Sequence, residues 1–251
     1  MNSIISYHEL VGIEKQNFQR GMNYRCSKGY LKLEIYRFDH IGYLNNDDFE
    51  NLPDQIIYFD SIKKYKPKVI FNLASETHVD RSIDAPVKFV KNNILSSLNL
   101  VDTIRKVYSK KKLKNFKLIH ISTDEVYGNI LNKPSDEKRA YKPNSPYAAS
   151  KASVDHILRS YKITYHLPLI IVNCCNNYGP YQFPEKFIPT AIISLLNRKS
   201  IPIYGNGKNV REWIHVQDYC CALEKIMKQG KIGQNYNVGS GFRLTNIDLS
   251  K

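Results

Sequence analysis

The order of apolar and polar positions predicts alternating strands and helices through the middle of the chain. Short apolar runs at residues 69–74, 116–121 and 168–172 are typical of buried strands. Between them, residues 86–108 and 146–163 are predicted helices. The first carries apolar side chains at helical spacing, namely Val87, Val90, Ile94, Leu98, Val101 and Ile104. This alternation predicts an α/β fold, with a Rossmann-like, doubly wound parallel sheet.

The flanking parts of the chain are less regular. Residues 31–38 alternate and predict one strand, whereas the rest of residues 1–50 predicts no definite element. The C-terminal part predicts a smaller α/β region. It consists of a loop at 176–180, a helix at 185–196, a strand and turn at 201–207, a strand at 211–216, a helix at 218–228 and a strand at 235–239. We therefore expect one domain at residues 1–173 and a second region at 174–251, some of whose elements return to the first sheet.

Composition indicates a globular, intracellular protein. Of 251 residues, 42% are hydrophobic and 24% are charged, and no apolar run approaches the ~20 residues that a membrane span needs. No apolar signal core is present near the N-terminus, so we expect a cytoplasmic protein. The five cysteines are odd in number and form no CxxC pair, which predicts reduced thiols and no metal site.

The net charge of +14 is compatible with nucleic acid, an anionic surface or a phosphate-bearing substrate as partner. The densest basic run is Lys110–Lys114, directly after a predicted helix, where cations complement the helix dipole. We therefore expect a solvated helix end there and no nucleic-acid site.

A first group of reactive side chains follows the strand at residues 116–121. Ser122–Gly128 places the Thr123 hydroxyl beside the carboxyl groups of Asp124 and Glu125. The carboxyl ends of parallel strands are where open α/β sheets bind their ligands. We expect these three side chains to line a ligand site.

A second group opens the helix at residues 146–163. Ser145 is a plausible cap and Pro146 suits the first helical turn. Tyr147 and Lys151 are four residues apart, so they share one helix face. A neighbouring cation favours the phenolate, so we expect Lys151 to lower the pKa of Tyr147 and make it a usable base.

Three longer motifs carry a family resemblance: Glu76–Ile83, Ser122–Gly128 and Asn176–Lys186. Together with Tyr147 and Lys151, and in this order, they resemble the dTDP-glucose 4,6-dehydratases, in the extended branch of the short-chain dehydrogenase/reductases. The resemblance runs from about Pro67 to Asn246. The adjacent acids Asp124 and Glu125 distinguish this family from the nucleotide-sugar epimerases, which lack both.

The resemblance implies an NAD-dependent dehydration of dTDP-glucose to the 4-keto-6-deoxy sugar. The C4 hydroxyl is oxidised, water is eliminated across C5 and C6, and the hydride returns to C6. Tyr147, activated by Lys151 and aided by Thr123, would accept the hydroxyl proton. Glu125 would remove the C5 proton and Asp124 would protonate the C6 hydroxyl, which requires environments that push their pKa values apart.

The resemblance also implies binding residues, an NAD-binding role for residues 1–173 and a nucleotide-sugar-binding role for residues 174–251. The cofactor would contact Leu73, Ala74, Ser75, Thr77, Asn92, Tyr147, Lys151 and Asn177. The substrate would contact Thr77, Thr123, Asn176, Lys186, Phe187, Pro202, Ile203, Tyr204, Arg211 and Asn246. A homodimer through the two long helices is expected, with no nucleic-acid, membrane or metal partner.

Two other conspicuous groups are better explained by structure than by chemistry. His78, Asp80 and Arg81 predict a hydrogen-bonded loop that positions neighbouring groups. Cys174 and Cys175 have no histidine–acid pair beside them in the sequence, so we expect them to pack rather than react.

The chain departs from the family pattern at its ends. The family begins with a strand and a glycine-rich turn that holds the cofactor pyrophosphate. Gly12, Gly21, Gly29 and Gly42 do not have that spacing. We expect a chain that is incomplete at both ends relative to the family. Three hypotheses remain open: this dehydratase, another nucleotide-sugar epimerase or decarboxylase, and a non-catalytic paralogue that acts through dimerisation.

Overall fold

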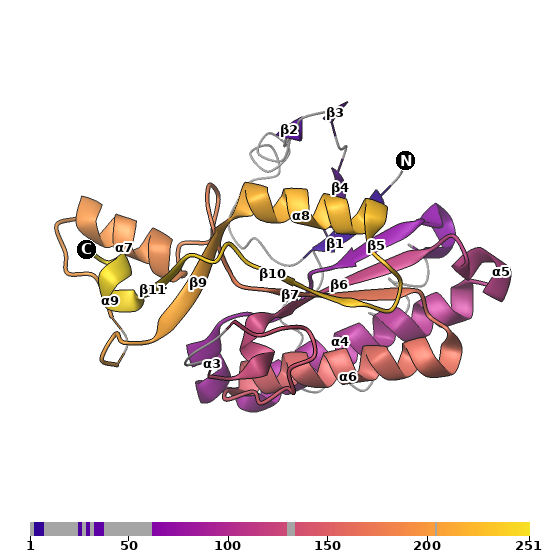
Figure 1. The fold of residues 1–251 in the computed structure, drawn as a ribbon, viewed down its shortest axis with the longest axis horizontal. Helices are drawn as coiled ribbons and strands as arrows, with labels where there is room; N and C mark the ends of the chain where they lie inside the picture. The colour runs from indigo at the N-terminus through magenta and orange to yellow at the C-terminus, as the bar shows by residue number, and fades with distance from the viewer. Residues whose placement is uncertain are drawn as a thin grey trace.

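A six-stranded parallel sheet forms the centre of the molecule (Figure 1). The computed structural model describes residues 62–129, 134–203 and 205–251, together with the backbone of short strands at 3–7, 25–26, 29–30 and 33–37. The spatial order of the strands is β10 (Asn235–Val238), β7 (Leu169–Cys174), β6 (Lys117–Thr123), β5 (Val69–Asn72), β1 (Ser3–Tyr7) and β4 (Leu33–Arg37). All five neighbouring pairs are parallel, which confirms the predicted α/β class.

Strand β1 marks the point where the strand order reverses. It pairs with β4 on one side and with β5 on the other, so the strands that follow it in the chain are added on opposite sides of it. Ligands of doubly wound sheets bind at such a switch point. The prediction of a strand at residues 31–38 is confirmed by β4, whereas the sequence predicted no strand at β1. A small hairpin, β2 (Arg25–Cys26) with β3 (Gly29–Tyr30), lies between them in the chain.

Helices cover both faces of the sheet. The long helices α4 (Pro86–Val107) and α6 (Pro146–Tyr165) lie together on one face, and α8 (Val216–Gln229) lies on the other (Figure 1). Side chains alternate between the faces along each strand. Leu118 therefore joins the core under α4 and α6, while Ile119 joins the core under α8.

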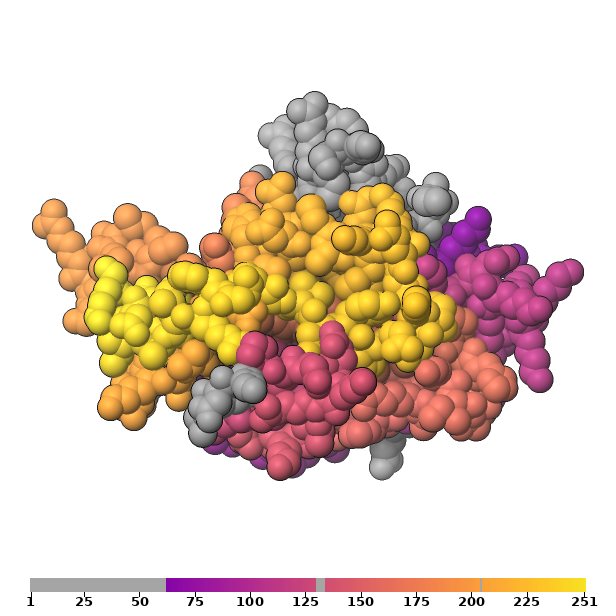
Figure 2. Space-filling model, viewed as in Figure 1, coloured from indigo at the N-terminus to yellow at the C-terminus, as the bar shows by residue number. Residues whose placement is uncertain are grey.

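A smaller three-stranded sheet extends from one end of the molecule. It consists of β8 (Asn176–Tyr178), β9 (Val210–His215) and β11 (Arg243–Thr245), with helices α7 (Phe187–Leu196) and α9 (Asn246–Leu249) beside it. Figure 2 shows the α7 and α9 region standing out from the main body. Strand β10 returns to the large sheet, as expected, although the division at residue 173 stays a prediction.

Several local predictions are wrong. The expected loop at residues 176–180 contains β8, because Asn176–Tyr178 pairs with β9, a contact distant in sequence. The expected strand in residues 201–207 does not occur in its described part, and residues 205–207 form a turn with positive φ at Gly205 (60°) and Gly207 (65°). The loop expected at His78, Asp80 and Arg81 is mostly helical, because α3 (Val79–Asp84) begins directly after His78.

The predicted apolar stripe of α4 is only partly buried. Val101 and Ile104 of the stripe are buried, whereas Val87 and Val90 are 66% and 40% exposed. The buried face also carries Phe89, Leu100 and the polar residues Asn93 and Ser97.

The basic run after α4 lies on the surface. Lys110–Leu113 forms the short helix α5, whose lysines are exposed while Leu113 is buried, as expected for a solvated helix end. Within the residues that the structure describes, none of the helices combines the length and the apolar character needed to cross a bilayer.

Candidate active site

The end of β6 fixes the first group of reactive side chains. The Thr123 hydroxyl accepts a hydrogen bond from the backbone N–H of Glu125 (3.3 Å) and thereby caps the 3₁₀ turn η2 (Asp124–Tyr127). Gly128 ends this turn with φ 73°, and a Cβ there would collide with the Lys142 carbonyl oxygen. The chain therefore turns sharply at the carboxyl edge of the sheet, where it holds both acids.

Helix α6 brings Tyr147 to the same place. The Ser145 hydroxyl caps the helix by accepting from the Ala148 N–H (3.1 Å), as the sequence predicted. The Tyr147 N–H donates to the buried Ser82 hydroxyl of α3 (3.1 Å). Tyr147 itself is buried, and Thr123, Asp124 and Glu125 lie close enough to influence the pKa of its hydroxyl. The structure thus brings together the four side chains that the two motifs predicted to meet.

Both carboxyl groups are harder to ionise than usual. Burial raises the pKa of Asp124 to about 7, the neighbouring Glu125 adds to the effect, and Arg211 opposes it. Burial also raises the pKa of Glu125, against the opposing charges of Arg211 and Lys186. Near neutral pH, Asp124 can therefore hold a proton, which matches the direction expected for an acid.

The expected effect of Lys151 on Tyr147 is wrong in this structure. The pKa of Tyr147 is raised, mainly by burial and then by the charge of Glu125, with only the hydrogen bond to Thr123 opposing among the main causes. The Lys151 ammonium group instead donates to the Ile121 carbonyl oxygen of β6 (2.7 Å). Burial lowers the pKa of Lys151 to about 8. The lysine ammonium group is directed toward the sheet backbone, and its charge is not among the main influences on the phenol.

The loop after β5 holds Leu73, Ala74, Ser75 and Thr77, which are candidate cofactor contacts, and is fastened to the helices behind it. The buried Asn93 carboxamide oxygen accepts from the Ser75 hydroxyl (3.1 Å) and the Glu76 N–H (2.7 Å). Its nitrogen donates to the Ser150 hydroxyl of α6 (2.9 Å). Asn93 therefore ties this loop to the helix that carries Tyr147.

Sequence reasoning missed Asn93 and Ser150. The signal was present, because Asn93 and Ser97 are polar residues four apart on a helix that is otherwise apolar at that spacing. Polar groups on an inner helix face require partners, and those partners lie on other elements.

Two asparagines differ in how they could serve a cofactor. The Asn92 side chain donates to the Glu76 carboxylate (3.1 Å), so its amide nitrogen is already engaged. Asn177 donates to the Cys174 sulfur (3.0 Å), whereas its buried Oδ1 atom has no partner within the described part of the chain. An unpaired buried acceptor is costly, and it fits a hydrogen-bond donor supplied by a ligand.

Two candidate substrate contacts bring positive charge to the acids. The Lys186 ammonium group donates to the hydroxyl and the carbonyl oxygen of Thr77 (3.0 and 3.1 Å) and lies within electrostatic range of Glu125. Arg211, on β9, acts on both Asp124 and Glu125. Elements of both sheets therefore contribute to one site.

The other candidate substrate contacts lie in the region of the smaller sheet. Asn176 opens β8, and the Phe187 ring lies 6.5 Å from the Trp213 ring, centroid to centroid. Pro202 and Ile203 are exposed, and Ile203 packs close to Gly207, as does Ile247 of α9. The N–H of Asn246 donates to the Asn209 carbonyl oxygen (3.2 Å). Tyr204 lies outside the described residues.

The residues to which the sequence assigned a structural role make structural contacts. The His78 ring accepts from the Arg81 N–H (3.3 Å) and caps α3, and Arg81 forms an ion pair with Glu185 (2.7 Å). Cys174 and Cys175 are buried and form no disulfide. Among the described residues, no group of three or more His, Cys, Asp or Glu side chains could hold a metal ion.

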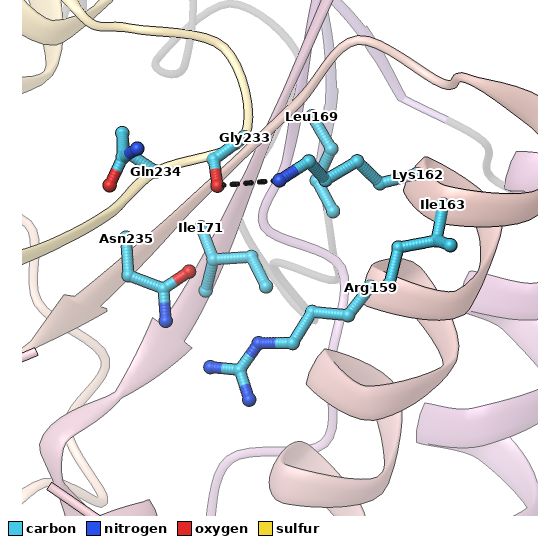
Figure 3. Close-up of a pocket in the computed structure, with 8 residues that line it drawn as sticks. All are labelled: Arg159, Lys162, Ile163, Leu169, Ile171, Gly233, Gln234 and Asn235. Atoms are coloured by element: carbon cyan, nitrogen blue, oxygen red, sulfur yellow. Dashed lines mark hydrogen bonds between the residues drawn. The ribbon is translucent and has the colours of Figure 1, made fainter. Parts of the chain in front are cut away.

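A cavity of about 160 Å³ lies apart from these reactive side chains. It opens between α6, which contributes Arg159 and Lys162, and the strands β7 and β10 (Figure 3). The Lys162 ammonium group donates to the Gly233 carbonyl oxygen (3.1 Å). None of the candidate catalytic or binding residues lines this cavity.

Comparison with known proteins identifies several relatives. The family model described as GDP-mannose 4,6 dehydratase matches residues 45–251. A dTDP-glucose 4,6-dehydratase from Salmonella typhimurium is 41% identical over 228 residues, which cover 85% of this chain and 60% of the relative. A similar enzyme from Escherichia coli K12 is 44% identical over 199 residues, 74% of this chain and 55% of the relative.

Solved structures of dTDP-glucose 4,6-dehydratases are also similar to this chain. The dTDP-glucose 4,6-dehydratase DesIV from Streptomyces venezuelae, crystallised with NAD bound, has a TM-score of 0.73 and 39% identity over 78% of this chain and 58% of its own. The Bacillus anthracis enzyme in complex with NAD has a TM-score of 0.76 and 33% identity, covering 100% of this chain and 78% of its own. The chain thus spans about three fifths of the first curated relatives. This chain belongs to the GDP-mannose 4,6 dehydratase family, and its similarity to dTDP-glucose 4,6-dehydratases confirms the predicted resemblance.

Proposed function

We propose that this chain carries the catalytic centre of an NAD-dependent hydro-lyase that converts dTDP-glucose to dTDP-4-keto-6-deoxyglucose. The observation that carries the proposal is the meeting of Thr123, Asp124, Glu125 and Tyr147 at the carboxyl end of β6. A phenol and two carboxyl groups are what an oxidation coupled to a water elimination requires. The names of the relatives support the same reaction.

The residues present fit an NAD cofactor at the switch point of the sheet. The loop after β5 borders that point, and the unpaired Asn177 Oδ1 atom offers an acceptor to a cofactor donor. The residues that would hold the cofactor are Leu73, Ala74, Ser75, Thr77, Asn92, Tyr147, Lys151 and Asn177. Ser75 would contribute its backbone, because its hydroxyl is bonded to Asn93. When bound, NAD would accept a hydride from C4 and return it to C6.

The protein side chains would move the protons. Tyr147 would accept the proton of the C4 hydroxyl, for which it must be in the phenolate form, while Thr123 hydrogen-bonds the same oxygen. Glu125 would take the C5 proton, and its raised pKa makes it a stronger base than an ordinary carboxylate. Asp124, with a pKa of about 7, would donate a proton as the bond between C6 and its oxygen breaks. One water leaves. As the hydride returns to C6, Glu125 would give its proton back to C5, so that over the whole turnover one proton passes from the C4 hydroxyl to Tyr147 and one from Asp124 to the departing water.

Substrate contacts follow from the elements around the acids. We expect Thr77, Thr123 and Asn176 to contact the sugar. The nucleotide diphosphate would lie along Lys186, Phe187, Pro202, Ile203, Tyr204, Arg211 and Asn246. Lys186 and Arg211 supply positive charge that suits phosphate oxygens. Because both also act on Glu125, substrate binding would be coupled to the charge of the base.

The test combines binding and product analysis. Purified chain is titrated with NAD by calorimetry and then incubated with NAD and dTDP-glucose, and the keto sugar is identified by its absorbance in alkali and by NMR. Keto product supports the proposal. Saturable NAD binding without keto product rejects the dehydratase, an epimer from a UDP-sugar indicates an epimerase, and no NAD binding by folded chain indicates a non-catalytic paralogue.

We further propose a cytoplasmic homodimer. The exposed apolar side chains Val87 and Val90 lie on α4, one of the two helices expected to pair subunits. The buried cysteines Cys174 and Cys175 form no disulfide, in keeping with a reducing compartment.

A further inference from the structure

A buried polar network lies behind Lys151, between α6 and β6. His120 and Ser122 alternate with Ile121 along β6, so both side chains point to the face that α6 covers. Asp155 lies four residues after Lys151 on α6 and therefore shares its helix face. The relative exposure of His120 and Asp155 is 0%, and that of Lys151 is 3%. Of these residues, only Lys151 was given a role in the proposed reaction.

The hydrogen bonds determine the tautomer of His120. The Asn72 amide nitrogen, which can only donate, lies 3.1 Å from the His120 Nδ1 atom, so Nδ1 is an acceptor. Burial beside Lys151 lowers the pKa of His120 well below its usual value, so the ring is neutral. The ring proton is therefore on Nε2, which lies 3.6 Å from the Asp155 Oδ1 atom.

Three donors converge on the Asp155 carboxyl group. Its Oδ2 atom accepts from the Ser122 hydroxyl (2.8 Å) and the Tyr141 hydroxyl (2.9 Å). Tyr141 must donate there, because Arg159 donates to its oxygen (2.9 Å). The Oδ1 atom faces the His120 N–H, at a distance slightly beyond hydrogen-bonding range, and neither atom has another partner among the residues that the structure describes. Burial raises the pKa of Asp155, and the hydrogen bonds from Ser122 and Tyr141 and the charges of Lys151 and Arg159 oppose that rise.

We infer that Asp155, oriented by His120, Ser122 and Tyr141, is a positioning residue that keeps the buried Lys151 side chain protonated at the active site. Lys151 Nζ bonds the Ile121 carbonyl oxygen rather than Asp155, so the carboxylate acts on the ammonium through space. Among the main influences on Lys151, burial disfavours its charge and Asp155 alone favours it.

Other groups near the pair do not replace this counter-charge. From β6, neutral His120 faces both side chains. Beyond Tyr141, the Arg159 guanidinium lies over the Tyr141 ring (4.8 Å), at the wall of the cavity in Figure 3. From α4, the groups near this face are the uncharged Asn93 and Ser97. The importance of a charged Lys151 rests on the proposed function, whereas the charge itself can be measured without cofactor or substrate.

The experiment follows the pKa of Lys151 in the full chain labelled with ¹³C-lysine, through the shift of its Cε carbon against pH. We expect Asp155→Asn to lower that pKa by about 1 or more, and Asp155→Glu to restore it toward the parent value. Tyr141→Phe, the matched control, removes a neutral donor from Asp155 but leaves its charge, so it should change the Lys151 pKa less.

A parent-like Lys151 titration in folded Asp155→Asn would overturn the inference, as would an equal effect of Tyr141→Phe. A measurement on the parent chain covers the case in which the variant does not fold. The ¹³Cγ shift of Asp155 must be that of a carboxylate at neutral pH, and a protonated Asp155 sinks the inference. These outcomes are independent of product formation, so failure of the proposed reaction remains distinguishable.

Discussion

At the scale of single residues, two adjacent acids share one turn yet meet different surroundings. Asp124 and Glu125 follow the same strand, and each is buried enough to raise its pKa. The charges of Glu125 and Glu212 raise the pKa of Asp124 further, and Arg211 lowers it. Two cations, Arg211 and Lys186, lower the pKa of Glu125, and Asp80 raises it. The environments thus differ in the sense that an acid and a base require.

The raised pKa of Asp124 makes stability depend on pH. A carboxyl group whose pKa is higher in the folded state favours folding most when it is protonated in both states. Its contribution is therefore full below the ordinary aspartate pKa of 3.8 and is lost as the pH rises to about 7. Asp124→Asn cannot ionise, so we expect its free energy of unfolding to rise relative to the parent across this range, by about 1–3 kcal/mol. Urea unfolding at several pH values measures the difference.

Above about pH 7 the difference should stay constant, because Asp124 is then ionised in both states of the parent. A pH-independent offset alone would show that the pKa of Asp124 is unperturbed.

The proposed role of Glu125 predicts a specific isotope result. Glu125→Gln removes the base for the C5 proton, so we expect product formation to fall about 10²–10⁴-fold. In D₂O the parent should place deuterium at C5 of the product, and the variant should slow this exchange by a similar factor. NMR of the sugar measures both. Normal C5 exchange in Glu125→Gln would assign the base to another residue.

At the scale of elements, the site depends on how loops are fastened to helices. Thr123 caps η2, Ser145 caps α6, and Asn93 connects the loop after β5 with α6. The loop and the two helices thereby form one hydrogen-bonded unit behind the candidate cofactor site. This arrangement predicts that Asn93, which was not among the candidate site residues, matters more for stability than its neighbour Asn92, which was.

Asn93 and Asn92 provide a matched pair for that prediction. Asn93→Ala leaves the Glu76 N–H without its partner and removes one of the two hydrogen bonds that each of the Ser75 and Ser150 hydroxyls makes. We expect a loss of about 2–4 kcal/mol in unfolding free energy, since each buried orphan costs about 1–3 kcal/mol. Asn92→Ala, at a half-buried position, should change stability by no more than about 0.5 kcal/mol. Equal losses, measured by urea unfolding, would contradict the role given to Asn93.

At the scale of the whole molecule, the large sheet supplies the reactive edge and the small sheet brings cations to it. Lys186 and Arg211 come from the region after β7, yet they lie beside the acids of β6. A separate feature is the start of α4, where the apolar side chains of Val87 and Val90 are exposed.

The homodimer proposal is tested at this scale. Val87→Glu with Val90→Glu places charge on the exposed side of α4, which we expect to convert a dimer into a monomer in sedimentation analysis. Leu196→Glu is the matched control, because Leu196 is 78% exposed on α7, outside the proposed interface. A parent chain that sediments as a monomer, or a double variant that remains dimeric, would contradict the proposal.

The sequence by itself determined the parallel strands, the two long helices and the clustering of reactive residues at the end of β6. These features are local: the period of apolar positions defines each element, and Thr123, Asp124 and Glu125 are adjacent in the chain. Helical spacing likewise placed Tyr147 and Lys151 on one face.

Only the tertiary structure decided the remaining features. Strand β8 exists through pairing with β9, and Asn93, His120 and Asp155 acquire their meaning from partners far away in sequence. The predicted direction of the Tyr147 pKa shift was wrong for the same reason. Spacing puts Lys151 on the correct helix face, but burial and the competing Ile121 carbonyl oxygen decide where its charge is directed, and these depend on how the elements pack.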